Sequence, residues 1–159
     1  MTTSSTRLSN LRKYLATAKG VVLETTTYKV IEDLKERNPY WSGTFERSWV
    51  GVAGNVSIPM IIAPPAEPPP VARTPKLITP PSVTRYQTGT SVSNYTIGNQ
   101  TTYRAVAQDL VVGRIKGGGN ETAGWDWYRG YLSSFFRSTL QATVTSVLKA
   151  DPRVTKNFS

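Results

Sequence analysis

The sequence contains no cysteine and no histidine. Without cysteine there is no disulfide, no thiolate nucleophile and no Cys-based metal site, and the redox compartment stays open. Without histidine the chain lacks the commonest general base and the commonest metal ligand. Because these absences leave no workable set of reacting groups, we expect a protein that is not an enzyme and that uses neither a metal nor a cofactor.

Acidic residues and long apolar runs are also scarce. The chain has 19 Lys+Arg against 10 Asp+Glu, a formal net charge of +9. Such an excess attracts nucleic acid, anionic lipid or an acidic protein face, although it can equally be a like-charged soluble surface. The strongest apolar run, residues 58–63, is far shorter than the roughly 20 residues of a membrane helix. With no signal-peptide core near the N-terminus, we expect a soluble protein that is not secreted and contacts no membrane.

Both ends of the chain are predicted to be helical. Near the N-terminus, apolar residues recur at steps of three, four, seven and eight, the period of one helical face: Leu8, Leu11, Leu15, Val22, Val30 and Leu34. They predict a helix over residues 6–37 that Pro39 ends and that Gly20 weakens enough to allow a kink. A second stripe predicts a helix over residues 125–149, weak only at Gly130 and ended by Asp151-Pro152. Its members are Tyr128, Leu132, Phe136, Leu140, Thr143 and Val147.

The middle of the chain has the character of strands. Residues 48–63 are predicted to form a hairpin that turns at Gly54-Asn55, and Pro59 places its second strand at a sheet edge or bulge. Further short strands are predicted at Val83 and at residues 85–87, 95–97, 103–107 and 110–112. The 159 residues fit one domain, 1–159. The predicted fold class is α+β, with long N-terminal and C-terminal helices packed on a small, mainly antiparallel sheet of about four strands.

Residues 64–81 form a proline-rich arm in this prediction. Eight of these 18 residues are proline, which excludes a helix or an interior strand and favours extended polyproline II. A long structureless insertion usually has a function, so we expect the arm to bind a partner, although a solvated linker is the alternative. Because Glu67 is its sole acid, the partner surface should be acidic. The predicted partner-binding residues are Pro68, Pro69, Pro70, Arg73 and Lys76, together with Trp41, since tryptophan is enriched at interface hot spots.

Three other groups of residues admit a chemical interpretation. The glycine-rich segment 113–119 lacks the Gly-Lys-Ser/Thr order of a phosphate-binding loop and is interpreted as a plain loop. The carboxylates Glu32, Asp33 and Glu36 share a helix face with nearby lysines and are interpreted as a solvated face. Basic residues also stand beside aromatic ones, a combination that proteins use to bind single-stranded nucleic acid, but the positions of these aromatic residues favour core packing. These pairs are Tyr103-Arg104, Tyr128-Arg129 and Phe136-Arg137.

Two segments resemble the neck and tail-completion proteins of tailed phages. Residues 42–49, SGTFERSW, follow the first helix as a Thr-Gly-x-Leu-Arg-x-Ser-Trp type segment does in that family, with Phe45-Glu46 in place of Leu-Arg. Asn99 and Tyr103 match an Ile-x-Asn-x-x-x-Tyr-Ala type strand that precedes the last helix.

The resemblance implies a non-catalytic virion protein assembled in the host cytoplasm. It would form a sixfold or twelvefold homo-oligomeric ring in the neck, between portal or adaptor and tail proteins. There it would line or seal the DNA channel, with non-specific contact to DNA. The alternative, which rests on charge, is a basic nucleic-acid-binding accessory protein.

Overall fold

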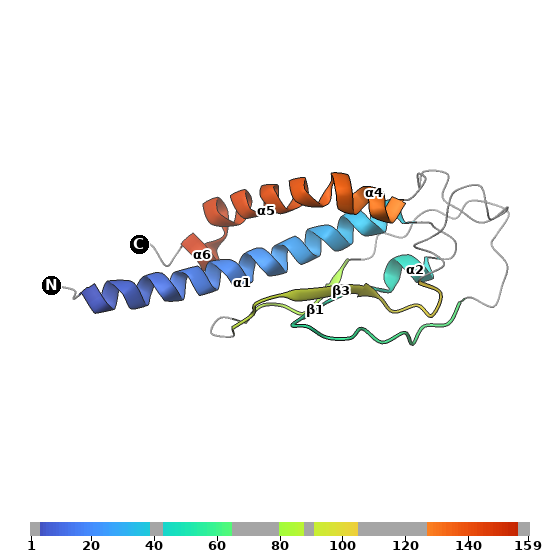
Figure 1. Cartoon of the computed structure of the whole chain (residues 1–159), viewed down its shortest axis with the longest axis horizontal. Coiled ribbons are helices and arrows are strands. Elements are labelled where there is room, and N and C mark those ends of the chain that lie inside the picture. Colours follow the sequence, from blue (N-terminus) through green and yellow to red (C-terminus); the bar gives the residue numbers. More distant parts are fainter. Residues whose placement is uncertain (1–3, 39–42, 65–79, 88–90, 105–126, 156–159) are drawn as a thin grey trace.

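The computed structural model describes residues 4–38, 43–64, 80–87, 91–104 and 127–155. These residues stack in layers, with a small sheet on one side of a long helix and the C-terminal helices on the other (Figure 1). The elements in chain order are α1 (Ser4–Arg37), α2 (Thr44–Arg47), β1 (Trp49–Ala53), β2 (Ser82–Val83), β3 (Tyr95–Asn99), α4 (Trp127–Ser134), α5 (Phe136–Ala150) and α6 (Pro152–Thr155). The α+β class is therefore confirmed, with a long N-terminal helix, C-terminal helices and a small sheet.

Helix α1 is the central element of the fold. Its 34 residues span about 51 Å, at a rise of about 1.5 Å per residue. It ends where the sequence predicts, because Pro39 cannot continue it, and the Asn38 N–H still reaches the Leu34 carbonyl at 2.9 Å. The helix runs unbroken through Gly20, where the Tyr86 ring packs so closely that a Cβ atom would lie 2.4 Å from its Cε2. Because glycine has no side chain, the segment that follows β2 can pack directly against α1 at this position.

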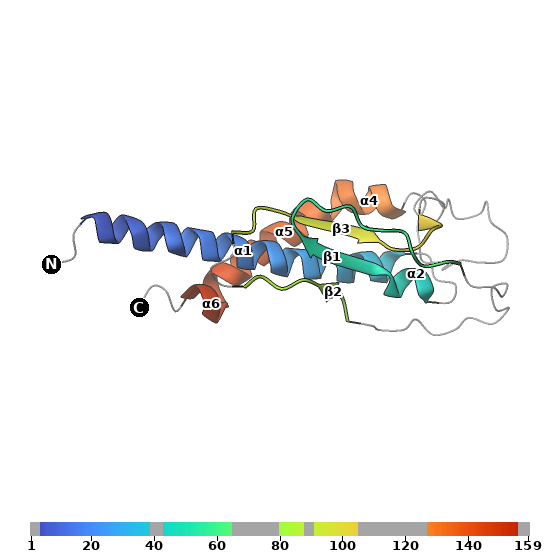
Figure 2. The same ribbon diagram turned by 90° about the horizontal axis from the view of Figure 1, so that it is seen from below.

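Within the described residues the sheet has three strands, where about four were predicted, and their order is β2-β1-β3. The sheet is mixed, with the longer pairing antiparallel as expected. Strand β1 pairs antiparallel with β3, with Trp49 opposite Asn99 and Ala53 opposite Tyr95, and parallel with β2. At its centre Gly51 faces α1, and a Cβ atom there would lie 2.4 Å from the Thr27 methyl group. The small residue lets the sheet lie directly on α1, as the view from below shows (Figure 2).

The predicted hairpin is wrong. Gly54 does turn the chain, with a φ of 96°, but residues 55–61 form no strand. Strand β3 takes the place next to β1 instead. After the turn the chain contacts the end of the sheet, where the backbone N–H groups of Ile61 and Ile62 donate hydrogen bonds to the Gln100 carbonyl, at 2.9 and 3.1 Å. Pro59 has no N–H to donate, which weakens any ladder on this segment. The strands predicted at residues 85–87 and at 103–104 are also absent, because 85–87 are extended chain outside the sheet and 103–104 lie in a turn. The rest of 103–107, and 110–112, lie outside the described residues.

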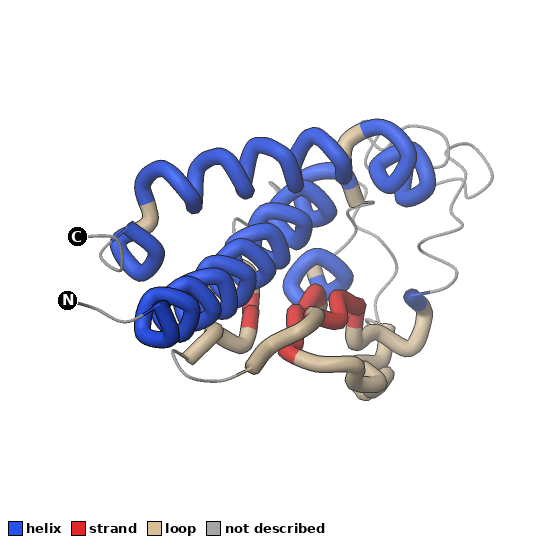
Figure 3. Tube along the Cα trace, turned by 60° about the vertical axis from the view of Figure 1, so that its left-hand side comes forward, coloured by secondary structure: helices blue, strands red, loops and turns tan. Residues whose placement is uncertain are grey.

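The C-terminal helix is divided at Phe135, and not at Gly130, into α4 and α5. Helix α5 lies along α1 and ends at Asp151-Pro152 as predicted, after which the single turn of α6 packs back on α1 (Figure 3). The predicted apolar face is only partly right, because Leu132 and Phe136 are exposed and Tyr131 is buried. Tyr131 turns inward because its hydroxyl reaches a carboxylate on α1, which apolar periodicity does not reveal.

Two apolar clusters hold these layers together, and α1 contributes to both. The first joins α1 to the sheet and α4 through Val30, Ile31, Leu34, Phe45, Trp49 and Tyr131. The second joins α1 to α5 and α6 through Ala18, Val21, Tyr86, Val147 and Val154. Leu8, Leu11 and Leu15, expected on the buried face, lie beyond both clusters and are exposed. None of the helices in the described ranges is both long and apolar enough to span a bilayer.

Candidate interaction site

The residues predicted to bind a partner lie outside the described part of the chain. Pro68, Pro69, Pro70, Arg73 and Lys76 fall within 65–79, and Trp41 falls within 39–42. The arm and its acidic partner therefore stay predictions. The glycine-rich segment 113–119 lies outside the described ranges as well.

The carboxylates on α1 serve internal contacts more than the sequence suggested. Glu32 forms an exposed ion pair with Lys29 at 2.7 Å, as expected of a solvated face. Asp33 instead accepts hydrogen bonds from the Tyr131 hydroxyl at 3.1 Å and from the Thr139 hydroxyl at 2.8 Å. Burial and the Asp33 charge raise the pKa of Tyr131, so this phenol stays protonated and keeps donating. Asp33 thus fastens both α4 and α5 to α1. Among the described residues, no three acidic side chains gather as a metal site would require.

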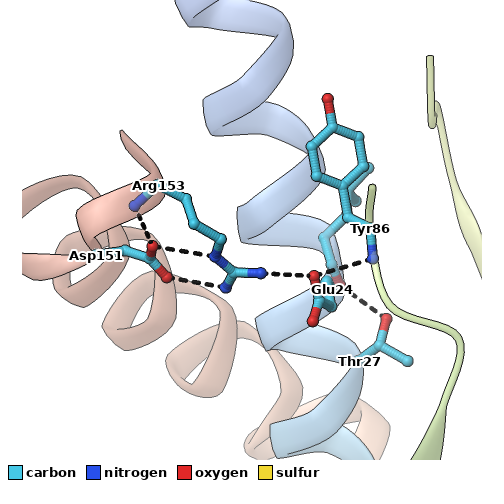
Figure 4. Close-up of polar contacts among 6 residues, drawn as sticks. Glu24, Thr27, Tyr86, Asp151 and Arg153 are labelled. Atoms are coloured by element: carbon cyan, nitrogen blue, oxygen red, sulfur yellow. Dashed lines mark hydrogen bonds and ion pairs between the residues drawn. The ribbon is translucent and has the colours of Figure 1, made fainter. Parts of the chain in front are cut away.

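A second carboxylate, Glu24, is buried at the junction of three segments (Figure 4). Its Oε2 accepts the Tyr86 backbone N–H at 3.0 Å and the Arg153 guanidinium at 2.9 Å. Arg153 in turn binds Asp151, and hydrogen bonds from Arg153 lower the pKa of Asp151. Sequence reasoning missed Glu24, because its partner Arg153 lies 129 residues away and no local pattern signals their pairing. The cluster ties α6 and the chain after β2 to α1.

Lys35 is a cation that the sequence placed on a solvated face but the structure buries. Its Nζ lies 3.4 Å from the Pro80 carbonyl, beside the start of β2. Burial lowers the pKa of Lys35, an effect that the nearby Glu46 charge opposes. This lysine therefore holds the chain entering β2 and is not offered to an external anion.

The two segments that carry the family resemblance meet in the structure. Trp49 is buried, with its ring edge-on to Phe45 at 5.7 Å and stacked on Tyr128 at 6.4 Å. Asn99 is fully buried beside them and donates from Nδ2 to the Phe45 carbonyl at 2.7 Å. The matching residues of both segments thus build one packed joint between α2, β1 and β3.

The basic–aromatic pairs divide between core and surface. Tyr103 and Tyr128 pack against the core, as predicted, and Arg104 donates to the carbonyls of Ile58 and Asn99. The Tyr103 ring and the Arg104 guanidinium therefore form contacts within the fold. The Phe136-Arg137 pair is different, because both side chains are exposed and Phe136 does not lie in the core.

Exposed apolar side chains gather at three places. The α1 surface comprises Leu8, Leu11 and Leu15, on the part of the helix that projects past α6 (Figure 1). The α4–α5 surface comprises Leu132, Phe135 and Phe136, with the Arg37 guanidinium 3.9 Å from the centre of the Phe135 ring. The loop surface is the extended chain after β1, on which Val56, Met60 and Ile61 are each exposed without sharing one face. Single exposed apolar residues are ordinary, but residues grouped on one helical face mark contact surfaces.

No family model, no curated protein and no solved structure matches this chain.

Proposed function

We propose that the chain is a non-catalytic structural subunit of a tailed-phage neck, forming a sixfold or twelvefold ring between portal or adaptor and tail. The observation that carries the proposal is the distribution of exposed apolar side chains over three separate surfaces of an elongated molecule. An enzyme needs one concave site, whereas a subunit between two neighbours in a ring and two adjoining layers needs contacts on several sides.

The polar side chains of the described core support the same proposal. Glu24 and Lys35, two of the buried charged groups, and the half-buried Asp33 are each engaged with a neighbouring segment of the chain. Their effect is to hold helices and sheet in fixed relative positions. A body whose charged groups serve internal rigidity and whose surface offers apolar contacts suits a protein that acts through its shape.

The joint around Trp49 supports the family resemblance on which the proposal also rests. The two resembling segments lie about 50 residues apart in sequence, yet Asn99 of one binds the Phe45 carbonyl of the other. A pair of segments that builds one buried joint has a physical reason to occur together in a family of related folds.

Quantitative mass spectrometry of purified virions, combined with a reconstruction of the neck, tests the proposal. The expected result is a copy number of six or twelve per particle and density for this fold between portal and tail tube. Absence of the chain from intact virions would remove the proposal, whatever the behaviour of the isolated protein.

The proline-rich arm has a separate test. Deleting residues 65–80 and bridging the ends with a short Gly/Ser linker should leave a folded subunit that fails to join heads to tails. A matched variant, in which the same stretch becomes Gly/Ser of equal length, separates reach from the properties of polyproline. Assembly of virions at wild-type yield with both variants would show that the arm is a linker and binds no partner.

A nucleic-acid-binding accessory protein is the second candidate, and the +9 charge favours it. Residues 4–23 of α1 contain Arg7, Arg12, Lys13 and Lys19 and no acid. Binding of the isolated chain to DNA, with an affinity that falls steeply as salt rises, would favour this candidate if the chain is also absent from virions.

A further inference from the structure

The leucines of the α1 surface belong to a longer heptad seam. Leu8, Leu11, Leu15, Ala18 and Val22 follow one another at steps of three, four, three and four. This is the a/d spacing that aligns apolar residues along one narrow side of a helix and lets it pack lengthwise against another helix. We call these five residues the α1 seam.

The molecule covers one half of the α1 seam and leaves the other half open. Ala18 is buried and Val22 is partly buried, both in the cluster formed with Val147 of α5 and Val154 of α6. Leu8, Leu11 and Leu15 are 56%, 49% and 56% exposed. The covering helices stop at this point while α1 continues for several turns (Figure 2). The same apolar side of one helix is thus covered by α5 and α6 at one end, and at the other end no described residue covers it.

Cations flank the open half of the seam on both sides. Arg7 precedes Leu11 by four residues, Arg12 follows Leu8 by four, and Lys19 follows Leu15 by four. In heptad terms these are e and g positions, whose charges meet the e and g positions of whatever helix lies alongside. With no acid in residues 4–23, the edges of the open half carry only positive charge, and the remaining edge position is the neutral Tyr14.

We infer that the open half of the α1 seam binds an amphipathic helix of another protein, one whose own seam is edged with Asp or Glu. Such a helix continues the packing that α5 and α6 begin and pairs its carboxylates with Arg7, Arg12 and Lys19. The inference goes beyond the proposed function, since it holds whether or not the chain is a virion subunit.

Charge argues against a second copy of this chain as the occupant. Two α1 seams packed together would set cationic edges against cationic edges, which disfavours the pair. Packing of the seam on the α4–α5 surface of a neighbour meets the same objection, because Arg37 lies over that surface and Arg129 and Arg137 are on its helices. The occupant must bring negative charge that this chain does not offer there.

Geometry argues against a lipid surface. Helices that lie in a membrane interface present a broad apolar face, commonly with Trp or Phe, to the acyl chains. The open half of the seam carries three leucines on one narrow line and no aromatic residue at its a and d positions. A narrow line of this kind matches the width of a helix–helix seam.

The test uses the full chain and two synthetic three-heptad peptides that are identical except at their edges. Both carry leucine at a and d, and one carries Glu and the other Lys at e and g. Calorimetric titration should show binding of the Glu-edged peptide at least tenfold tighter than that of the Lys-edged peptide, with the difference reduced by salt.

Two variants of the chain separate the apolar and charged contributions. The triple substitution Leu8→Gln, Leu11→Gln and Leu15→Gln should abolish binding while leaving the thermal midpoint unchanged, since these side chains are exposed and glutamine suits a helix. Arg7→Glu, Arg12→Glu and Lys19→Glu together should reverse the preference toward the Lys-edged peptide. Leu132→Gln, on the α4–α5 surface, is the matched control and should bind as wild type does.

Several outcomes would overturn the inference. Failure of the Glu-edged peptide to bind, equal binding of both peptides, or an unchanged preference after charge reversal would each do so. Self-association of the chain that the triple glutamine variant abolishes would assign the seam to a second copy. Binding to phosphatidylserine vesicles or to DNA that depends on these leucines, with no binding of the Glu-edged peptide, would assign it to those partners instead.

Discussion

The side-chain amide of Asn99 donates a 2.7 Å hydrogen bond to the backbone carbonyl of Phe45, and neither residue is open to water. The Oδ1 atom of the same amide accepts the Thr101 N–H at 3.0 Å and the Thr101 hydroxyl at 2.8 Å. One buried side chain therefore supplies hydrogen-bond partners both to a backbone carbonyl of α2 and to polar groups of the chain that leaves β3. This arrangement fixes the end of the sheet against the Trp49 cluster.

Replacing Asn99 should destabilise the fold strongly. Asn99→Ala leaves the Phe45 carbonyl and the Thr101 N–H buried without these partners, and each such group costs about 1–3 kcal/mol. Urea unfolding followed by circular dichroism measures the loss. Asn94→Ala, at an exposed asparagine just before β3, is the control and should change stability by less than about 0.5 kcal/mol. Equal effects of the two substitutions would contradict the assigned role.

The Glu24–Arg153 pair should show energetic coupling. Arg153→Ala leaves the buried Glu24 carboxylate without its counter-ion and should lower the free energy of unfolding. In a Glu24→Gln background the same substitution should lower the free energy of unfolding by less, because no buried charge loses its partner. Because the Arg153 side chain is 42% exposed, water screens the pair, and we expect a coupling of about 1 kcal/mol in a double-mutant cycle.

The exposed pair Lys29–Glu32 provides the comparison for that cycle. Its side chains are 56% and 44% exposed, so a cycle there should give less than about 0.5 kcal/mol. Coupling at Lys29–Glu32 as large as that at Glu24–Arg153 would mean that burial does not decide the strength of these pairs.

Asp151 should make stability fall in acid. Hydrogen bonds from Arg153 hold the pKa of Asp151 below its ordinary value, so the folded state binds the proton less readily than the unfolded chain. The contribution is complete above the unfolded pKa of about 3.9 and is lost as pH falls through that value toward the folded pKa. The stability difference between wild type and Asp151→Asn, measured by urea unfolding, should therefore shrink below about pH 4. Glu36→Gln, at an exposed site, controls for the loss of one negative charge.

Two helical glycines should respond to alanine in opposite directions. At Gly20 the new Cβ would lie 2.4 Å from the Tyr86 ring, and the overpacking should outweigh the better helix propensity, for a net loss of about 1–2 kcal/mol. At Gly130 the Cβ would meet no described atom within 4 Å, and alanine should add about 0.5–1 kcal/mol of stability. Thermal unfolding of the two variants measures both effects. Stabilisation by Gly20→Ala would show that Tyr86 does not pack closely on α1.

Features of the fold that depend on local chemistry could be predicted from the amino-acid sequence. The 3.6-residue apolar period and the prolines at 39 and 152 set the helical ends of the chain, because helices form from contacts within a few residues. The α+β class and the strand at residues 95–97 followed in the same way. The partner-binding residues predicted on the arm lie outside the described ranges, so that part of the site stays a prediction.

Which segments meet depends on the packing of the whole chain and could not be predicted from local patterns. Strand β1 pairs with β3 instead of forming a hairpin, because pairing depends on which faces the whole chain can bury. The burial of Glu24 depends on Arg153, 129 residues away, and no local pattern encodes that partner. The leucines at positions 8, 11 and 15 have the same period as the covered residues Ala18 and Val22. Whether they lie in the core depends on where α5 and α6 end relative to α1, which is a property of the packed helices and not of the repeat.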